Sequence, residues 1–267
     1  MTEILIPTAA LRSDIEALKA LSQLDVGVSL KVYGFTFTLV RREQDLHRWY
    51  ETMDFIKERL NPACRWSISR DHIIETRDYY NVVVLVTHKA EERPGVPYKP
   101  AETLLSSFSA GLIEENSGYI GLTCGRTFES KIKGIETGND NVDFKAGLVA
   151  RCLLTNYMLR QGIREIYNYA ATEGLISYYT TLGFRLGKES CGKEDAITEL
   201  HEKYIQEGRS LEELLTALGP EYKIKPGYRM KLCSGIEGIC LKAIATLRKF
   251  EDTLAKYNDV YWYGAIA

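Results

Sequence analysis

The stretch KAGLVARCLLTNYMLRQGIREIYNYAATEGLISYYTTLGFRLG, residues 145–187, decides the fold class. Apolar residues recur at helical spacing from Leu148 to Gln161, and Gly162 stands where a helix ends in a left-handed residue. The run IREIYNYA then predicts a strand, residues 176–181 predict a short helix, and Arg185-Leu186 predict a further strand. This alternation of helix and strand predicts an α/β domain.

The chain before this stretch supplies most of the expected sheet. Runs of β-branched and aromatic residues predict strands, and apolar residues at three- and four-residue spacing predict helices. The tripeptide Asn116-Ser117-Gly118 predicts a turn between two strands. In chain order we expect a helix at 9–21 with Leu11, Ile15, Leu18 and Leu21 on one face, a strand at 28–40, a helix at 44–60, a strand at 81–88, two strands within 106–128 and one at 131–137.

The chain after residue 187 adds helices to this core. Residues 188–226 form an insertion with two predicted charged helices, and residues 228–232 return to strand. The S-x-x-E capping box at 234–237 opens a long helix with one broad apolar face. We expect this face to pack on the core, with a homodimer interface as the alternative. Residues 260–263 (VYWY) predict an edge strand or a docked tail.

Composition and charge favour a globular protein and argue against a nucleic-acid-binding or membrane-spanning one. The 267 residues are 45% apolar, and 34 basic and 36 acidic side chains give a formal charge of -2, which is ordinary for a globular protein. Proteins that bind duplex nucleic acid usually carry a strongly basic face, so we expect no nucleic acid partner. No apolar run reaches the roughly 20 residues of a membrane span, and residues 1–10 do not resemble a secretion signal. We therefore expect a cytoplasmic protein.

The cysteines and histidines predict neither a metal centre nor a cysteine nucleophile. The six cysteines form no C-x-x-C pair, and the four histidines form no H-E-x-x-H motif. We interpret the cysteines as buried or free thiols, because a reduced thiol behaves mostly as a small apolar side chain. The segment 91–101, which holds three prolines, is interpreted as a surface loop or a substrate lid.

Residues 145–187 resemble the second half of the GNAT superfamily of acyl-CoA-dependent N-acyltransferases. The most specific match is Tyr179-Thr-Thr-Leu-Gly-Phe184, which is similar to the family's Y-x-x-L-G-F. The strand at 228–232 is similar to one that closes the family's fold, and residues 34–49 resemble its first strand and helix. The resemblance implies a mixed, mostly antiparallel sheet flanked by helices, with N-terminal (1–30), inserted (188–226) and C-terminal (233–267) additions to a domain spanning 31–232.

The resemblance also implies an acyl-CoA co-substrate, such as acetyl-CoA, whose pyrophosphate is bound at the start of the central helix. The family's Q/R-x-x-G-x-G/A signature is kept in part, with Lys145 at its basic position, Leu148 and Ala150 at its glycine positions, and Gly147 one residue earlier. Thr172 replaces an asparagine common in the family. The implied cofactor-binding residues are Lys145, Ala146, Gly147, Leu148, Val149, Ala150, Arg151 and Thr172.

The same site can be argued from physical chemistry. A helix N-terminus presents N–H groups and partial positive charge to an anion, and Lys145 and Arg151 add charge to the turn that starts at Asp143. An ordinary capped helix start is the alternative. The strand IREIYNYA offers main-chain groups to the pantetheine arm, as the splayed central strands of similar enzymes do.

Attack of an amine on a thioester requires a proton for the departing thiolate and a base for the amine. By resemblance, Tyr179 is the general acid, whereas the neighbouring Tyr178 points about 100° away on a helix. A core tyrosine is the alternative. For the base, similar enzymes use a carboxylate on a central strand, which makes Glu136 the first candidate and Glu114 and Glu115 the others.

The sequence therefore predicts an N-acyltransferase that moves an acetyl or longer acyl group to an amine by direct attack, without a metal. The acceptor can be a small molecule, a peptide or a protein. Two alternatives remain open: a catalytically degenerate module that binds acyl-CoA or another protein, and an enzyme whose donor is an acyl carrier protein.

Overall fold

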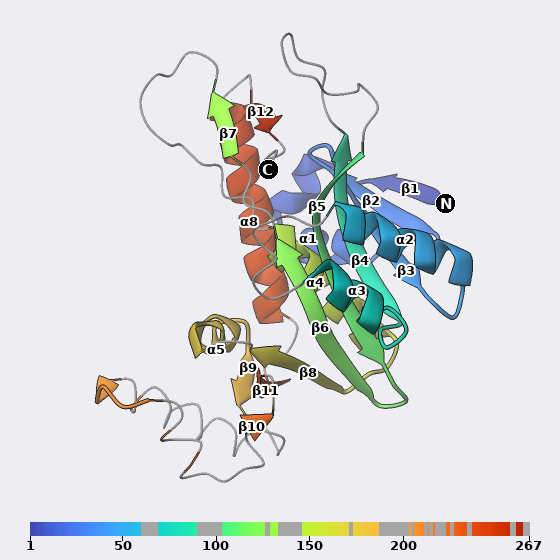
Figure 1. Ribbon diagram of the computed structural model, residues 1–267. Coiled ribbons are helices and arrows are strands. Elements are labelled where there is room, and N and C mark those ends of the chain that lie inside the picture. The colour runs from blue at the N-terminus through green and yellow to red at the C-terminus, as the bar shows by residue number, and fades with distance from the viewer. Residues whose placement is uncertain are drawn as a thin grey trace.

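The computed structural model describes residues 1–59, 69–89, 103–125, 129–132, 146–170, 173–186, 203, 206–210, 213, 216, 223–224, 227–233, 237–256 and 260–263. Within these residues the central element is a ten-stranded sheet (Figure 1). Its spatial order is β1-β2-β3-β4-β5-β6-β8-β11-β10, and β9 also pairs with β11. The strands are β1 Thr2–Leu5, β2 Val28–Val32, β3 Phe35–Arg41, β4 Val82–Lys89, β5 Thr103–Ile113, β6 Ser117–Gly125, β8 Glu165–Ala170, β9 Phe184–Leu186, β10 Lys223–Ile224 and β11 Gly227–Leu232.

Most neighbouring strands of this sheet are antiparallel. The described exceptions are the pairs β1–β2 and β6–β8, which are parallel. The chain passes from β6 to β8 through the helix α4, Ala146–Arg160, as a parallel pair requires a crossover connection. The predicted mixed, mostly antiparallel sheet is confirmed.

Helices cover both faces of the sheet (Figure 1). On one face, α2 (Leu46–Glu58) and α3 (Arg70–Thr76) pack through Trp49, Met53, Ile56 and Ile73. On the other face, α4 packs on the sheet, α8 (Glu237–Lys256) packs on α4, and α1 (Asp14–Leu21) packs on α8. Residues 146–158 of α4 are all buried, because this helix is covered by the sheet on one side and by α8 on the other.

The long C-terminal helix packs on the core, as predicted. Ile239, Cys240, Ala243, Ile244 and Leu247 of α8 are fully buried within the single chain. They contact the same hydrophobic cluster as α4 and α1. The alternative, that this apolar face forms a homodimer interface, is therefore wrong for these residues.

The predicted N-terminal helix at 9–21 is two shorter elements. A 3-10 turn, η1 (Thr8–Arg12), precedes α1, and Ser13 lies between them in an extended conformation and caps α1 by accepting from the amide of Glu16. The break changes the helical phase, so the predicted shared face is wrong. Leu11 and Leu21 are buried, whereas Ile15 is 75% exposed. Strand β1, which pairs with β2, was not predicted.

The predicted single strand at 28–40 is a hairpin of β2 and β3. Tyr33 and Gly34 connect the strands with φ angles of 50° and 80°, both in the left-handed region. Two successive left-handed residues match the twist of a two-residue hairpin turn. The single-strand prediction failed because Gly34, which favours a turn, stands within a run whose other residues favour a strand.

The remaining described elements agree with the predicted ones in part: α3 and β10 were not predicted, and the strand expected at 131–137 overlaps the described β7 (Glu129–Ile132) only at residues 131–132. The two strands expected within 106–128 are β5 and β6, and the predicted short helix is α5 (Glu173–Thr180). Gly162 ends α4 with a φ of 83°, as predicted. Residues 260–263 form the strand β12, which pairs with β7 in a separate two-stranded sheet. The predicted lid at 91–101 and most of the insertion at 188–226 lie outside the described residues.

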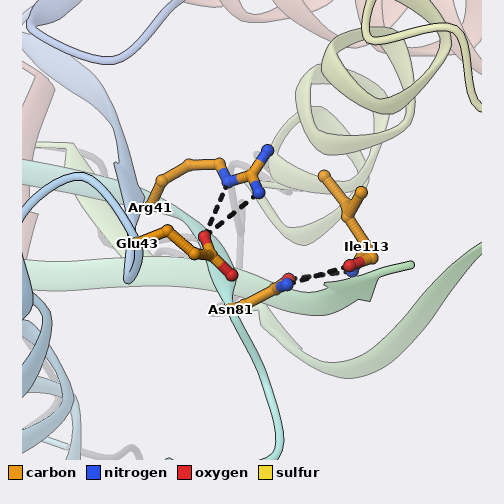
Figure 2. A network of polar contacts seen from close by, with 4 residues as sticks. All are labelled: Arg41, Glu43, Asn81 and Ile113. Carbon is orange, nitrogen blue, oxygen red and sulfur yellow. Dashed lines mark hydrogen bonds and ion pairs between the residues drawn. The ribbon is translucent and has the colours of Figure 1, made fainter. Parts of the chain in front are cut away.

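A polar network ties the start of β4 to the ends of β3 and β5 (Figure 2). Asn81 donates from Nδ2 to the carbonyl of Ile113 at 2.9 Å and accepts from its amide at 2.8 Å. Beside it, Arg41 forms an ion pair with Glu43 at 3.1 Å. Burial disfavours the charged Glu43 carboxylate, but a backbone hydrogen bond and Arg41 outweigh it, so the pKa of Glu43 is lowered.

The cysteines differ in part from the predicted thiols. Cys124 and Cys233 are disulfide-bonded. Cys152 of α4 and Cys240 of α8 are free thiols, fully buried, with their Sγ atoms 2.6 Å apart. Spacing along the chain does not reveal which cysteines meet in the fold, so the disulfides were missed. None of the helices in the described part of the chain is long and apolar enough to cross a membrane.

Candidate active site

The parallel strands β6 and β8 pair over only part of their lengths. Their register runs from Ser117 opposite Glu165 to Ile120 opposite Asn168. Beyond this point β6 continues to Gly125 beside β5, whereas β8 continues to Ala170 beside β11 (Figure 1). We call Ile120 and Asn168 the divergence point. Past the divergence point, β6 and β8 no longer form hydrogen bonds with each other. Main-chain groups on their facing edges can therefore pair with an extended ligand.

A β-bulge in β6 lies at the divergence point. Ala110 of β5 pairs with Leu122 and Gly111 pairs with Ile120, so Gly121 is the extra residue. Tyr80 packs directly against the main chain of Gly121 and occupies the place that a Cβ would fill. A bulge redirects the strand and leaves ladder groups unpaired. Sequence analysis missed this feature, although an isolated glycine inside a strand is a signal for it.

The start of α4 is the predicted pyrophosphate site. The helix begins at Ala146, so Leu148 and Ala150, which replace the family's glycines, already belong to its first turns. The first four N–H groups of a helix have no acceptor within it. Residues 146–150 are buried as whole residues, main chain included. Lys145 and Thr172 lie outside the described residues, and their roles stay predictions.

Tyr179, the predicted general acid, lies in the last turn of α5 and faces α4. Its side chain is 7% exposed, whereas the neighbouring Tyr178 is on the outside of the helix at 37%. Leu182 and Phe184 follow it into the same hydrophobic cluster, and the Phe184 ring lies 6.3 Å from the Tyr179 ring. Gly183, with a φ of 93°, turns the chain from α5 into β9. The predicted difference in direction between the two tyrosines is confirmed.

Arg151 of α4 is brought to Tyr179. Its Nη2 donates to the Tyr179 hydroxyl oxygen at 3.1 Å, and its Cζ lies 4.4 Å from the centre of the tyrosine ring. The sequence pattern suggested that Arg151 adds charge to the pyrophosphate turn. In the structure its hydrogen-bonding partner is the candidate acid, 28 residues away in sequence.

Asn168 is a polar residue of the site that sequence analysis missed. It lies in β8 at the divergence point and is 1% exposed. Ile166 and Ala170, two residues to either side, belong to the cluster that contains Tyr179, so alternation along the strand places Asn168 on that same face. Its Nδ2 has no hydrogen-bond partner within the described residues. An asparagine within the predicted strand IREIYNYA is the signal that could have found it.

The opposite face of β6 and β8 carries a tyrosine cluster, which consists of Tyr79, Tyr80, Tyr119 and Tyr169. The rings of Tyr119 and Tyr169 are 4.9 Å apart and connect β6 with β8. Burial raises the pKa of Tyr80 to about 12, against an opposing hydrogen bond with Tyr119. Burial also raises the pKa of Tyr119. Both phenols are therefore neutral at physiological pH, and Tyr79 is 53% exposed.

Two of the candidate bases, Glu114 and Glu115, are not brought to Tyr179. Both are exposed in the turn between β5 and β6, before the paired part of β6 begins. They lie at the end of β6 where the strands are joined, and not at the end where they diverge. Glu136 lies outside the described residues. No group of three or more histidine, cysteine, aspartate or glutamate side chains in the described segments is placed to hold a metal ion.

Comparisons with known proteins give a structural neighbour. Neither a family model nor a curated protein sequence matches the chain. The crystal structure of Tetrahymena GCN5 is similar with a TM-score of 0.40 and 12% sequence identity, and the match covers 74% of this chain and 94% of that one.

Proposed function

We propose that the chain is an N-acyltransferase that moves an acyl group from a CoA thioester to an amine at the divergence of β6 and β8. The observation that carries this proposal is the parallel strand pair that ends at Ile120 and Asn168, with the Gly121 bulge beside it. An extended acyl-pantetheine chain has amide groups that match the main-chain groups freed there. The resemblance of the motifs in residues 145–187 to those of the GNAT superfamily supports the same donor.

The bound acyl-CoA extends from the start of α4, where its pyrophosphate lies, to Tyr179, where its thioester lies. The first N–H groups of α4 bind the pyrophosphate through their orientation and partial positive charge, and Lys145 adds a cation. The pantetheine arm then follows the edges of β6 and β8. Thr172, between β8 and α5 in sequence, contributes one hydroxyl hydrogen bond. This path brings the thioester to the face on which Tyr179 and Asn168 lie.

The reaction is a direct transfer. The amine nitrogen attacks the thioester carbonyl carbon, and main-chain N–H groups freed at the bulge stabilise the oxyanion. The C–S bond then breaks, its electron pair goes to sulfur, and Tyr179 donates its phenolic proton to that sulfur. Glu136 remains the proposed base for the proton that the amine loses.

The acceptor approaches from the tyrosine cluster. This cluster lies on the face of the sheet opposite Tyr179, so donor and acceptor reach the reacting carbon from different sides. Its exposed member, Tyr79, is next to Tyr80, which contacts the bulge at Gly121. Neutral phenol rings attract an ammonium group over their faces and tolerate an apolar body beside it. An amine-bearing small molecule, peptide or protein fits this surface.

The test has two stages. Thermal unfolding is measured with CoA, acetyl-CoA and longer acyl-CoAs, because a ligand that binds only the folded protein at about 100 times its Kd stabilises it by about 2.7 kcal/mol. A shift that depends on acyl length identifies the donor, and turnover is then measured with a panel of amines. The absence of a shift with every thioester overturns free CoA as donor, and an acyl carrier protein is then tried in its place.

The matched variants are Tyr179→Phe and Tyr178→Phe, which remove one hydroxyl each from adjacent residues of α5. We expect Tyr179→Phe to lower kcat by about 100-fold or more, the usual contribution of a general acid, and Tyr178→Phe to change it little. Equal turnover in both variants rejects Tyr179 as the acid. Binding of acyl-CoA without turnover of any amine favours the alternative, a non-catalytic acyl-CoA-binding module.

A further inference from the structure

Arg151 carries a buried positive charge that nothing in the described structure neutralises. Its side chain is 4% exposed, yet none of the carboxylates in the described segments forms an ion pair with it. Its Nη1 has no hydrogen-bond partner among the described residues, and its Nη2 donates to the neutral phenol of Tyr179. By contrast, Arg160 of the same helix pairs with Asp25, and Arg248 pairs with Asp14.

This arrangement is costly for the folded protein. A buried charge without a partner is unfavourable by several kcal/mol, and even a paired one often contributes little stability. An apolar side chain of similar length would fill the same space at a smaller cost. The position of Arg151 is therefore better explained by a negative charge that arises or binds there than by packing.

The hydrogen bond fixes the direction of the phenolic proton. A guanidinium group has donors and no acceptor, so the Tyr179 oxygen must accept from Arg151. The phenol's own hydrogen then points away from Arg151 and is available to another acceptor. The ring itself is held by the cation above it and by Phe184 at its edge.

We propose that Arg151 is the positioning residue of the acid: it orients the Tyr179 phenol and neutralises the negative charge that forms as the thiolate leaves. This role rests on the proposed acyl transfer. When the C–S bond breaks, the electron pair goes to sulfur and the phenolic proton follows it. The resulting phenolate is paired with the guanidinium of Arg151 until water returns a proton to it. A charge-assisted hydrogen bond to the phenolate is stronger than the present one to the neutral phenol.

The competing assignment is that Arg151 binds the pyrophosphate of CoA, as its distance from the start of α4 in sequence suggested. The two assignments predict different kinetics. A phosphate contact acts in the ground state and is lost as weaker donor binding, whereas assistance to the leaving group acts in the transition state and is lost as a lower kcat.

The experiment compares Arg151→Met, Arg151→Lys and the control Arg160→Met, which removes a cation from the last turn of the same helix. For each variant, kcat, the KM for acyl-CoA, the midpoint of thermal unfolding and the ultraviolet absorbance of the bound CoA thiolate against pH are measured. We expect Arg151→Met to lower kcat by about 100-fold with little change in KM. Arg151→Lys should retain part of the kcat that Arg151→Met loses, and Arg160→Met should leave kcat unchanged.

Two further measurements separate this role from a structural one. Because an unpaired buried charge is removed, Arg151→Met should unfold at the same temperature as the wild type or higher. CoA bound to the wild type should also ionise at lower pH than CoA bound to Arg151→Met, since the guanidinium favours a nearby thiolate.

The outcomes are distinct. A loss expressed in KM alone assigns Arg151 to the pyrophosphate, and a lower unfolding temperature with unchanged kcat assigns it to packing; both overturn the proposal. If Arg151→Met does not fold, Arg151→Lys with wild-type kcat overturns it as well. Failure of the wild type to bind CoA instead rejects the proposed function, and it does so without any Arg151 variant.

Discussion

The phenol of Tyr80 lies against the main chain of Gly121, in the space that a side chain at position 121 would need. The contact joins the segment between α3 and β4 to the bulge of β6. It also explains why glycine stands at this bulge, because the hydroxyl oxygen and two ring carbons of Tyr80 are the nearest atoms to the missing Cβ.

Gly121→Ala should destabilise the protein and displace the bulge. The added methyl group overlaps the buried Tyr80 ring, and overpacking of this kind costs about 1–3 kcal/mol. The free energy of unfolding in urea measures the cost. Tyr80→Ala combined with Gly121→Ala should recover part of the loss relative to the sum of the single variants, since the clash is then relieved. Additive losses would show that the two residues do not interact.

Asn81→Ala should weaken the junction of β4 and β5. Asn81 replaces a backbone unit by bonding both the amide and the carbonyl of Ile113. The truncation removes two hydrogen bonds and should cost about 2 kcal/mol in urea unfolding. Asn116→Ala, in the exposed turn between β5 and β6, is the control and should change stability by less than about 0.5 kcal/mol. Similar losses in the two variants would contradict the network in Figure 2.

The lowered pKa of Glu43 predicts a specific loss of stability in acid. Because the folded protein holds this carboxyl ionised more strongly than the unfolded chain, the contribution is complete above its ordinary pKa of 4.5. It is lost as the pH falls through the lower folded-state pKa. The free energy of unfolding should therefore fall more between about pH 7 and about pH 3 in the wild type than in Glu43→Gln. Arg41→Gln should reduce this difference, and parallel curves for the wild type and Glu43→Gln would refute it.

Cys152 and Cys240 should resist alkylation in the folded protein. Burial, followed by the hydrogen bond with Cys240, raises the pKa of Cys152, and only the thiolate attacks an alkylating reagent. Both thiols have no solvent exposure. Mass spectrometry after treatment with iodoacetamide should find them unmodified in buffer and modified in denaturant. Labelling of Cys152 at equal rates in the two conditions would disagree with the packing of α4 on α8.

The sequence predicted the elements whose signal is local. The end of α4 at Gly162 and the helix with Tyr179 depend on residues within one or two turns of each other, and both are confirmed. The turn expected at Asn116-Ser117-Gly118 lies at residues 114–116 instead, because Ser117 and Gly118 already belong to β6. The break at Ser13 and the hairpin at Tyr33 and Gly34 were also local, but continuous apolar patterns obscured them. They show that a single capping serine or turn glycine outweighs a longer periodic pattern.

The site depends on contacts that local patterns do not contain. Arg151 was placed near the start of α4 correctly, but its partner Tyr179 became visible only when α4 and α5 were seen side by side. Asn168 and Gly121 are candidate site residues because they lie where β6 and β8 separate. No spacing in the sequence marks that point. The candidate acid could be predicted because it belongs to a short motif, whereas the groups around it could not.

The cover that α8 provides for α4 has a consequence for biosynthesis. Cys152 of α4 and Cys240 of α8, which are in contact, are 88 positions apart in the sequence. The helix α4 and most of the sheet therefore leave the ribosome well before α8 does. During that interval the side of α4 that α8 covers, which includes Cys152, faces solvent. Contacts between residues far apart in the sequence slow folding, and apolar surface that is exposed in the meantime promotes aggregation. The nascent chain should therefore depend on a holding chaperone from the completion of α4 until α8 docks.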